Sequence, residues 1–372
     1  MNRLNLSLIS GLCLSAVSLS AGAQDIPAEI LAMFRPTVGD SIQSVEVTAP
    51  GEVTFRIYAP DAQRVSVTGD LGYFGPLAPQ LEKDDRGVWQ GTARGVEPGV
   101  YRYQFVVDGV KVNDPKSEVA NETRPMLEYD PSGEAFWAVR DVPHGAVSTI
   151  YYPSATTGET RRMHIWTPAG YNHLTEPLPV LYLIHGGGDN DAAWTGVGRA
   201  NFILDNLLAD GQMVPMLVVM PDGSIDTGLF TQELMNDVIP YVEANYQVLT
   251  DKDHRAVAGL SMGGLETLDV SLSHYEAFSY AFPLSTGWFI GSAFYDQWEP
   301  YLKENAQAIN QSYKIYKFFM GGETDIAHRN GIATREVFDR CGVKYDYDSM
   351  EGGHSWTVWR HNLRDIAPLL FR

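Results

Sequence analysis

The stretch that decides the fold reads Gly-Leu-Ser-Met-Gly-Gly at residues 259–264, with Ser261 in third place. It follows a short apolar run and precedes residues 265–268, which are compatible with a helix. A serine on a strand-to-helix turn needs glycine on both sides, because the backbone is tight and neighbouring Cβ atoms would clash. The turn exposes the hydroxyl and brings the N–H of Met262 near a developing oxyanion. G-x-S-x-G patterns are common by chance, so the flanking strand and helix carry the prediction of a nucleophilic serine.

Apolar runs on both sides of this turn predict a buried sheet. Runs typical of strands covered on both faces lie at residues 180–184, 216–220, 256–258 and 315–320. Helical stretches, such as residues 200–208 and 232–245, separate them. Alternation of strand and helix predicts an α/β fold with a mainly parallel sheet and helices on both faces.

A second glycine-rich turn supports the serine. The apolar run 180–184 leads into His185-Gly186-Gly187-Gly188. In α/β hydrolases a turn of this kind supplies the second backbone N–H of the oxyanion hole, and Gly187 is the expected donor.

A serine nucleophile also needs a base and an acid that orients the base. In α/β hydrolases the acid and then the histidine follow the serine along the chain. Asp325 follows the strand-like run 315–320, and His354 follows the last such run in a glycine-flanked loop. Glu323 is the alternative acid, and Asp325 could instead cap a helix. Glu323, Asp325 and His328 match no common metal-ligand spacing, so no metal site is expected.

Residues 44–129 show a sequence pattern different from the strand-and-helix alternation of the rest of the chain. They contain short alternating runs at 53–58, 64–68 and 100–107, and an Asp108-Gly109 turn. This spacing, without helical periodicity, predicts a small β-sandwich. With 372 residues in the chain, two or three domains are expected at roughly 150 residues each.

The charge composition of the chain restricts the kinds of partner that it is expected to bind. The chain has 46 acidic and 27 basic residues, a net charge of −19. Such a surface repels phosphate backbones and anionic lipid, which argues against nucleic acid and membrane surfaces as partners; a neutral polysaccharide is compatible with it.

Residues 1–23 combine Arg3, an apolar stretch and an A-x-A-like end, so we expect a bacterial-type signal peptide and a secreted or periplasmic protein. The mature chain would then keep one cysteine, Cys341, and no internal disulfide.

These motifs together resemble the esterase D-like hydrolases of carbohydrate esterase family 1, which contains feruloyl and acetyl xylan esterases. The resemblance covers residues 146–372 and rests on the segments already named, with residues 190–194 and 353–359 added. It places the acid on Asp325 and the base on His354.

Residues 40–130 resemble carbohydrate-binding module family 48, an early-set, immunoglobulin-like sandwich. Trp89 alternates within a predicted strand there, so we expect it in the core.

With the signal peptide (1–23) read from its own residues, the resemblance implies a family 48-like sandwich (24–140) and an α/β-hydrolase esterase domain (141–372). It implies a secreted serine esterase that removes feruloyl groups from plant xylan or arabinoxylan and needs no cofactor. The expected partner is a plant cell-wall polysaccharide or a feruloylated oligosaccharide; the sequence does not indicate an oligomeric state. An acetyl xylan esterase is the first alternative. A siderophore esterase and a carbohydrate-binding protein with an inactive hydrolase scaffold are the others.

The acyl group could stack on aromatic side chains near the predicted pocket. Trp194, Trp288 and Trp356 are the expected substrate contacts, with Trp359 also near the pocket loops. The stretch 286–289 follows the strand-like run 280–284. Core packing is an equal explanation for any one of these tryptophans.

Overall fold

The computed structural model describes residues 37–71, 77–117 and 125–372. The predicted signal peptide lies outside the described residues. The chain divides into two compact units: residues 1–41, in which helix α2 (Val38–Ser41) is described, and residues 42–372. The second unit holds every other element named below, and the expected boundary at residue 140 falls inside it.

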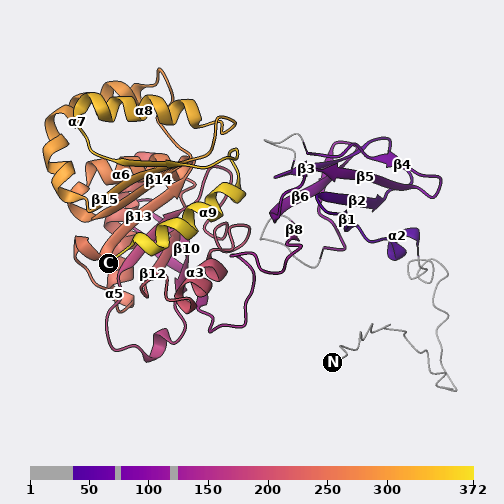
Figure 1. The fold of residues 1–372 in the computed structure, drawn as a ribbon, viewed down its shortest axis with the longest axis horizontal. Coiled ribbons are helices and arrows are strands. Elements are labelled where there is room, and N and C mark those ends of the chain that lie inside the picture. Colours follow the sequence, from indigo (N-terminus) through magenta and orange to yellow (C-terminus); the bar gives the residue numbers. More distant parts are fainter. Residues whose placement is uncertain (1–36, 72–76, 118–124) are drawn as a thin grey trace. The chain divides into compact units, whose positions relative to one another are not determined.

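The first strands of this unit form the expected sandwich of two antiparallel sheets (Figure 1). One sheet has the order β1 (Val45–Ala49), β2 (Glu52–Tyr58), β5 (Val88–Arg94), β4 (Glu82–Lys83). The other contains β3 (Val65–Gly69), β6 (Gly99–Val107) and β7 (Val110–Val112), and β8 (Met126–Tyr129) also pairs with β6.

Two local predictions for the sandwich are confirmed. Asp108 and Gly109 both have positive φ, 48° and 92°, and join β6 to β7. Trp89 is buried among the sandwich core residues, and its Nε1 donates to the carbonyl of Ala59.

The larger sheet has eight strands in the order β16-β15-β14-β13-β11-β12-β10-β9. Their bounds are β9 (Ala146–Ser154), β10 (Glu159–Thr167), β11 (Val180–Ile184), β12 (Leu217–Pro221), β13 (Arg255–Leu260), β14 (Tyr280–Leu284), β15 (Ile315–Met320) and β16 (Asp346–Ser349). The six strands from β11 to β16 pair in parallel, whereas β10 is antiparallel to both β12 and β9. The sheet is therefore mainly parallel, as expected.

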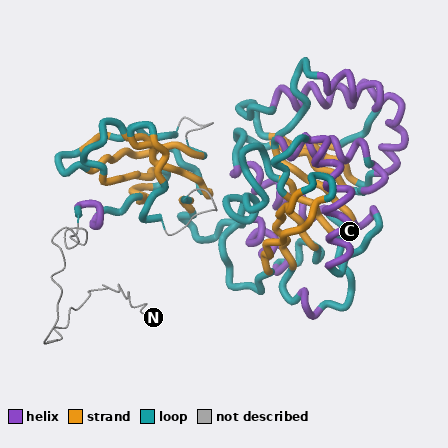
Figure 2. The backbone as a smooth tube through the Cα atoms, turned by 180° about the vertical axis from the view of Figure 1, so that it is seen from behind, coloured by secondary structure: helices purple, strands orange, loops and turns teal. Residues whose placement is uncertain are grey.

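Helices cover both faces of this sheet (Figure 2). The main helices are α3 (Ala200–Ala209), α4 (Thr227–Glu233), α5 (Ile239–Asn245), α6 (Met262–Ser273), α7 (Ala293–Ser312), α8 (His328–Cys341) and α9 (Trp356–Ile366). Short helical turns lie at η1 (Tyr171–His173), η3 (Lys252–His254), η4 (Tyr275–Ala277) and η5 (Ala367–Leu369). In β11, Leu181 belongs to the core shared with α3 and α9, and its neighbour Tyr182 to the core shared with α4 to α8. This alternation is that of a strand buried on both faces.

The predicted helix at 232–245 is interrupted. A π-helical turn, η2 (Leu234–Val238), separates α4 from α5. Pro240 lies in the first turn of α5 and has no backbone N–H to donate, so the regular hydrogen-bond ladder cannot continue through it.

The topology places the predicted site at one edge of the sheet. The carboxyl ends of β11, β13, β15 and β16 lead directly to the loops that hold Gly187, Ser261, Asp325 and His354. Carboxyl ends of parallel strands meet at the same edge, so four segments far apart in the sequence converge there.

Candidate active site

Ser261 sits on a strained turn between β13 and α6. Its backbone has φ 55° and ψ −114°, a conformation that L-residues rarely adopt. Glycine is required on both sides: a Cβ atom on Gly259 would lie 2.2 Å from the carbonyl oxygen of Gly263, and one on Gly263 would lie 2.2 Å from that of His185. The Ser261 N–H donates to the carbonyl of Leu284 at 2.9 Å, which fixes the turn against β14. The strain is thus held by close packing of the surrounding backbone.

Ser261, His354 and Asp325 form one hydrogen-bonded chain. The Ser261 Oγ lies 2.8 Å from His354 Nε2, and His354 Nδ1 lies 2.8 Å from Asp325 Oδ1. With a neutral imidazole, Nδ1–H donates to the carboxylate and Nε2 accepts the serine proton, which is the tautomer that a general base requires. Glu323 is exposed, and the carboxylate on the imidazole is that of Asp325.

The Asp325 carboxyl is suited to remain ionised. Its side chain is fully buried, and burial opposes ionisation. The hydrogen bond and charge of His354, with the N–H of Ala327 donating at 2.8 Å, outweigh that effect and hold the pKa of Asp325 below its usual value. An ionised Asp325 stabilises an imidazolium on His354 as it forms.

The two segments predicted to supply the oxyanion donors, at Gly187 and Met262, lie against each other. Met262 begins α6, so its N–H is among the first-turn donors that have no acceptor within the helix. A Cβ atom on Gly186 would lie 3.1 Å from the Cβ of Ser261, and one on Gly187 would lie 2.9 Å from Met262 Cγ. The glycine turn therefore packs directly on the serine, at a distance that only glycine permits.

A buried ion cluster anchors the end of this glycine turn. Asp191 accepts from Arg162 at 2.6 Å and lies 2.7 Å from His164 Nδ1; both partners belong to β10. Burial opposes ionisation of Asp191, but the bonds to His164 and Arg162 outweigh it and lower the pKa of the carboxyl. The turn is thereby tied to a strand of the sheet.

Two cavities open beside Ser261 and His354. The smaller, of about 80 Å³, is mostly apolar, with Met262, Leu265, Phe289 and Ile326 in its wall. The larger, of about 610 Å³, has a mixed lining that is more apolar than polar and includes the charged side chains of Asp70, Arg102 and Asp189. An ester placed on Ser261 thus has a small apolar space and a larger space of mixed lining available.

The tryptophans predicted to contact substrate are buried. Trp194 and Trp288 are each 1% exposed and are absent from the walls of both cavities. Trp194 packs edge-on against Trp356 and donates to the carbonyl of Ile184, while Trp288 stacks on Trp298. Core packing therefore explains both residues, and the expectation that they touch substrate is corrected.

Trp356 borders the larger cavity although it is only 3% exposed. Trp359 also lines this cavity and packs edge-on against the His354 ring, with centroids 5.0 Å apart. The exposed apolar side chains beside the serine are instead Met262, Phe289 and Ile326, at 39%, 50% and 60%. Phe289 follows Trp288 directly, and within the predicted stretch it is Phe289 rather than Trp288 that lines the smaller cavity. No sequence signal singled out Ile326.

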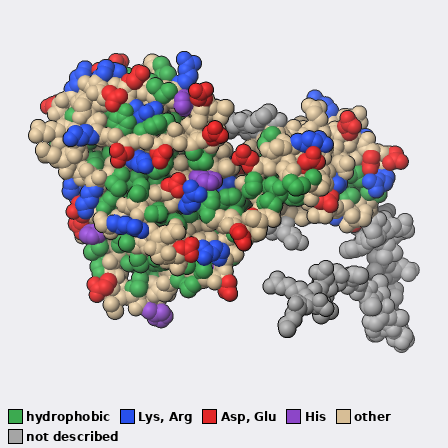
Figure 3. Space-filling view, viewed as in Figure 1, with side chains coloured by type: hydrophobic (Ala, Val, Ile, Leu, Met, Phe, Trp, Pro, Cys, Tyr) green, Lys and Arg blue, Asp and Glu red, His purple; other side chains and the backbone are tan. Residues whose placement is uncertain are grey.

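Other kinds of site receive no support from the described part of the chain. No group of three or more His, Cys, Asp or Glu residues there could hold a metal ion. No helix within residues 37–71, 77–117 and 125–372 is long and apolar enough to cross a bilayer. On the face seen in Figure 3, acidic and basic side chains are interspersed, so the net negative charge is not gathered there into one patch.

Comparison with protein-family models gives two matches. Residues 154–370 match the model described as "Putative esterase". Residues 43–122 match "Carbohydrate-binding module 48 (Isoamylase N-terminal domain)".

Individual relatives point the same way. An endo-1,4-beta-xylanase/feruloyl esterase of Xylanibacter ruminicola is 33% identical over 348 residues, which are 88% of this chain and 46% of that protein. The chain thus spans about half the length of this relative. A mutant of the feruloyl esterase module from Clostridium thermocellum, solved with sinapinate, is 25% identical with a TM-score of 0.56, covering 66% of this chain and 94% of that one.

One neighbour shares the fold over most of the chain. The enterochelin esterase from Shigella flexneri has a TM-score of 0.64 and covers 90% of this chain and 98% of its own, at 18% identity. At that identity the likeness concerns the fold.

Proposed function

Since the chain belongs to the esterase family whose model spans residues 154–370, we propose that it is a secreted serine carboxylesterase that hydrolyses feruloyl esters on plant xylan or arabinoxylan. The observation that carries the proposal is the continuous hydrogen-bonded chain from Ser261 through His354 to Asp325, flanked by two cavities of different size. The names of the feruloyl esterase relatives support the substrate class.

The first half-reaction transfers the acyl group to the enzyme. Ser261 Oγ attacks the ester carbonyl while His354 Nε2 accepts its proton, and Asp325 stabilises the resulting imidazolium. The N–H groups of Gly187 and Met262 donate to the tetrahedral oxyanion. The bond to the sugar oxygen then breaks, that oxygen takes the proton from His354, and the acyl group remains on Ser261.

The second half-reaction repeats these roles with water. His354 takes a proton from a water molecule, the resulting hydroxide adds to the acyl carbonyl, and the same two N–H groups receive the charge. Collapse of this intermediate returns the proton to Ser261 and releases the free acid. The step consumes one water and regenerates the enzyme.

The two cavities suggest how the ester is oriented. The small space beside Met262, Phe289 and Ile326 suits an aromatic acyl group, because burying an apolar ring there also covers exposed side chains. The larger space suits the saccharide, because its mixed lining offers charged groups to the hydroxyls and aromatic side chains to the apolar faces of the sugar rings. The match to a carbohydrate-binding module supports a polysaccharide partner for the sandwich.

A comparison of two esters tests the acyl preference. We expect a higher kcat/KM on methyl ferulate than on methyl acetate, which has the same leaving group, because a buried phenyl ring contributes about 2 kcal/mol, or roughly 30-fold. The opposite preference would indicate an acetyl pocket, and release of acetate from acetylated xylan would then identify an acetyl xylan esterase.

A further inference from the structure

Arg102, on sandwich strand β6, occupies a buried position between two carboxylates. It is 7% exposed, and its Nε and Nη2 each donate to Asp70 at 3.0 Å. Its Nη1 donates to Asp189, which follows the glycine turn of the hydrolase sheet. Burial opposes the charge on Arg102, but Asp70 and Asp189 outweigh it and raise the pKa of the guanidinium. The side chain is therefore a permanent, fully engaged cation.

Asp189 belongs to the turn that carries the oxyanion donor. It lies two residues after Gly187, and its N–H donates to the carbonyl of Gly186 at 3.2 Å, which closes the turn. Its own carbonyl accepts from Ser224 Oγ at 3.1 Å. A displacement of the Asp189 side chain would therefore also shift the Gly187 N–H, because Asp189 lies only two residues further along the backbone.

Strand β6 is itself fixed to the hydrolase core. Val100, two residues before Arg102, is 1% exposed and belongs to the same buried cluster as Leu181 of β11. The buried Arg360 of α9 also donates to the carbonyl of Val100 at 3.4 Å and to that of Val197 at 2.9 Å. Arg102 therefore extends from an anchored strand, as a positioning group must.

We propose that Arg102 is a positioning residue for ester hydrolysis: through Asp189 it holds the turn at residues 186–189, and with it the Gly187 N–H, in place for the oxyanion. The inference rests on the proposed function. The sandwich then contributes to catalysis on any ester, including one that carries no sugar. Arg102 also neutralises Asp70 and Asp189, two carboxylates that line the same cavity as Ser261 and would otherwise oppose a developing negative charge.

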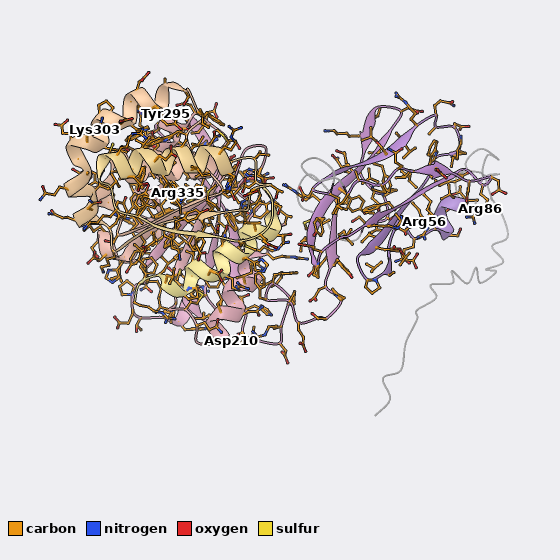
Figure 4. All side chains as sticks on the ribbon, turned by 45° about the horizontal axis from the view of Figure 1, so that its top comes forward. Arg56, Arg86, Asp210, Tyr295, Lys303 and Arg335 are labelled. Atoms are coloured by element: carbon orange, nitrogen blue, oxygen red, sulfur yellow. The ribbon has the colours of Figure 1, made fainter. Side chains whose placement is uncertain are left out.

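The test uses full-length Arg102→Met, Asp189→Asn and the double variant, with methyl ferulate and p-nitrophenyl acetate as substrates. Arg56→Met is the matched control, because Arg56 forms an ion pair with Glu46 at 2.8 Å within the sandwich. Arg56 is labelled in Figure 4. Removal of one oxyanion donor costs about 10²- to 10³-fold in kcat, so misplacing it should cost about 10- to 100-fold. We expect that loss in both single variants with KM nearly unchanged, and no loss in the control.

Two further readouts separate positioning from general damage. Inhibition by phenylboronic acid, whose adduct with Ser261 carries a negative tetrahedral boron, should weaken by the same factor as kcat. The double variant should be no worse than the poorer single variant, because both changes break one link. Arg102→Lys should recover part of the rate that Arg102→Met loses. Thermal unfolding identifies any variant that fails to fold. If the Arg102 variants do not fold, the result for Asp189→Asn tests the inference by itself.

The result that overturns the inference is a folded Asp189→Asn enzyme with kcat and boronate inhibition within about twofold of wild type. A loss confined to KM on feruloylated oligosaccharides would also overturn it, since Arg102 would then act on the sugar. Failure of the proposed function looks different: the wild-type protein itself would hydrolyse neither ester.

Discussion

Phe289 offers a quantitative test of the acyl cavity. A fully buried phenylalanine removes about 200 Å² from water. Phe289 is 50% exposed, so about 100 Å² remain to be covered. A planar acyl group can cover one face of the ring, or about 50 Å², worth about 1.2 kcal/mol at 25 cal/mol per Å². Phe289→Ala should therefore lower kcat/KM on methyl ferulate about eightfold.

The assay compares methyl ferulate with p-nitrophenyl acetate in the same variant. The acetyl group has no ring to pack on Phe289, so we expect kcat/KM on p-nitrophenyl acetate to stay within about twofold of wild type. Ile290→Ala is the matched control, because Ile290 is adjacent and 59% exposed but does not line the cavity. An equal loss on both esters, or no loss on methyl ferulate, would show that the acyl ring binds elsewhere.

Three other outcomes are expected. Asp325→Asn should lower kcat on the order of 10⁴-fold, because the imidazole loses the partner that sets its tautomer, whereas Glu323→Gln should stay near wild type; the reverse ranking would make Glu323 the acid. Burial, with repulsion from Asp222, raises the pKa of Glu266 in the folded protein well above its usual value. Between the ordinary pKa and the folded pKa, the folded state must therefore hold a proton that the unfolded state releases. The free energy of unfolding then falls by up to about 1.4 kcal/mol for each pH unit in that range. Glu266→Gln should therefore raise Tm, by more at pH 8 than at pH 5; a constant or negative difference would contradict this. Mass spectrometry of protein exported by a bacterial host should find Gln24 at the N-terminus, and an uncleaved chain would exclude the signal peptide.

The sequence allowed the catalytic constellation to be predicted because its signals are local. Ser261 and Gly187 lie in turns whose glycines are dictated by close backbone contacts, and such contacts leave a pattern within a few residues. Asp325 and His354 follow parallel strands, and their order along the chain placed them at the same sheet edge. The structure brings these side chains together; their catalytic roles remain part of the proposal.

Strands β9 and β10 were not predicted, and their residues explain why. β9 is largely exposed along its length, so it lacks an apolar pattern. In β10, Arg161 and Arg162 are directed at the buried carboxylates of Glu233 and Asp191, which places charge where alternation would predict apolar residues. A short stretch of sequence around these two arginines does not show that each pairs with a carboxylate far away in the chain.

Substrate contacts were the least predictable feature. A tryptophan near a catalytic loop can pack inward or outward, and Trp194 and Trp288 pack inward because the core has space for them. The contact between Arg102 and Asp189 could not be foreseen either, since Arg102 lies 87 residues before Asp189 and on a strand of the sandwich. Such contacts depend on tertiary packing that no spacing rule encodes.

The most direct test of the central claim is hydrolysis of methyl ferulate by wild-type protein and by Ser261→Ala under identical conditions. The account predicts turnover by the wild type and a loss on the order of 10⁶-fold in the variant, with an unchanged melting temperature. A folded Ser261→Ala protein that kept even about a tenth of the wild-type rate would show that another group performs the attack.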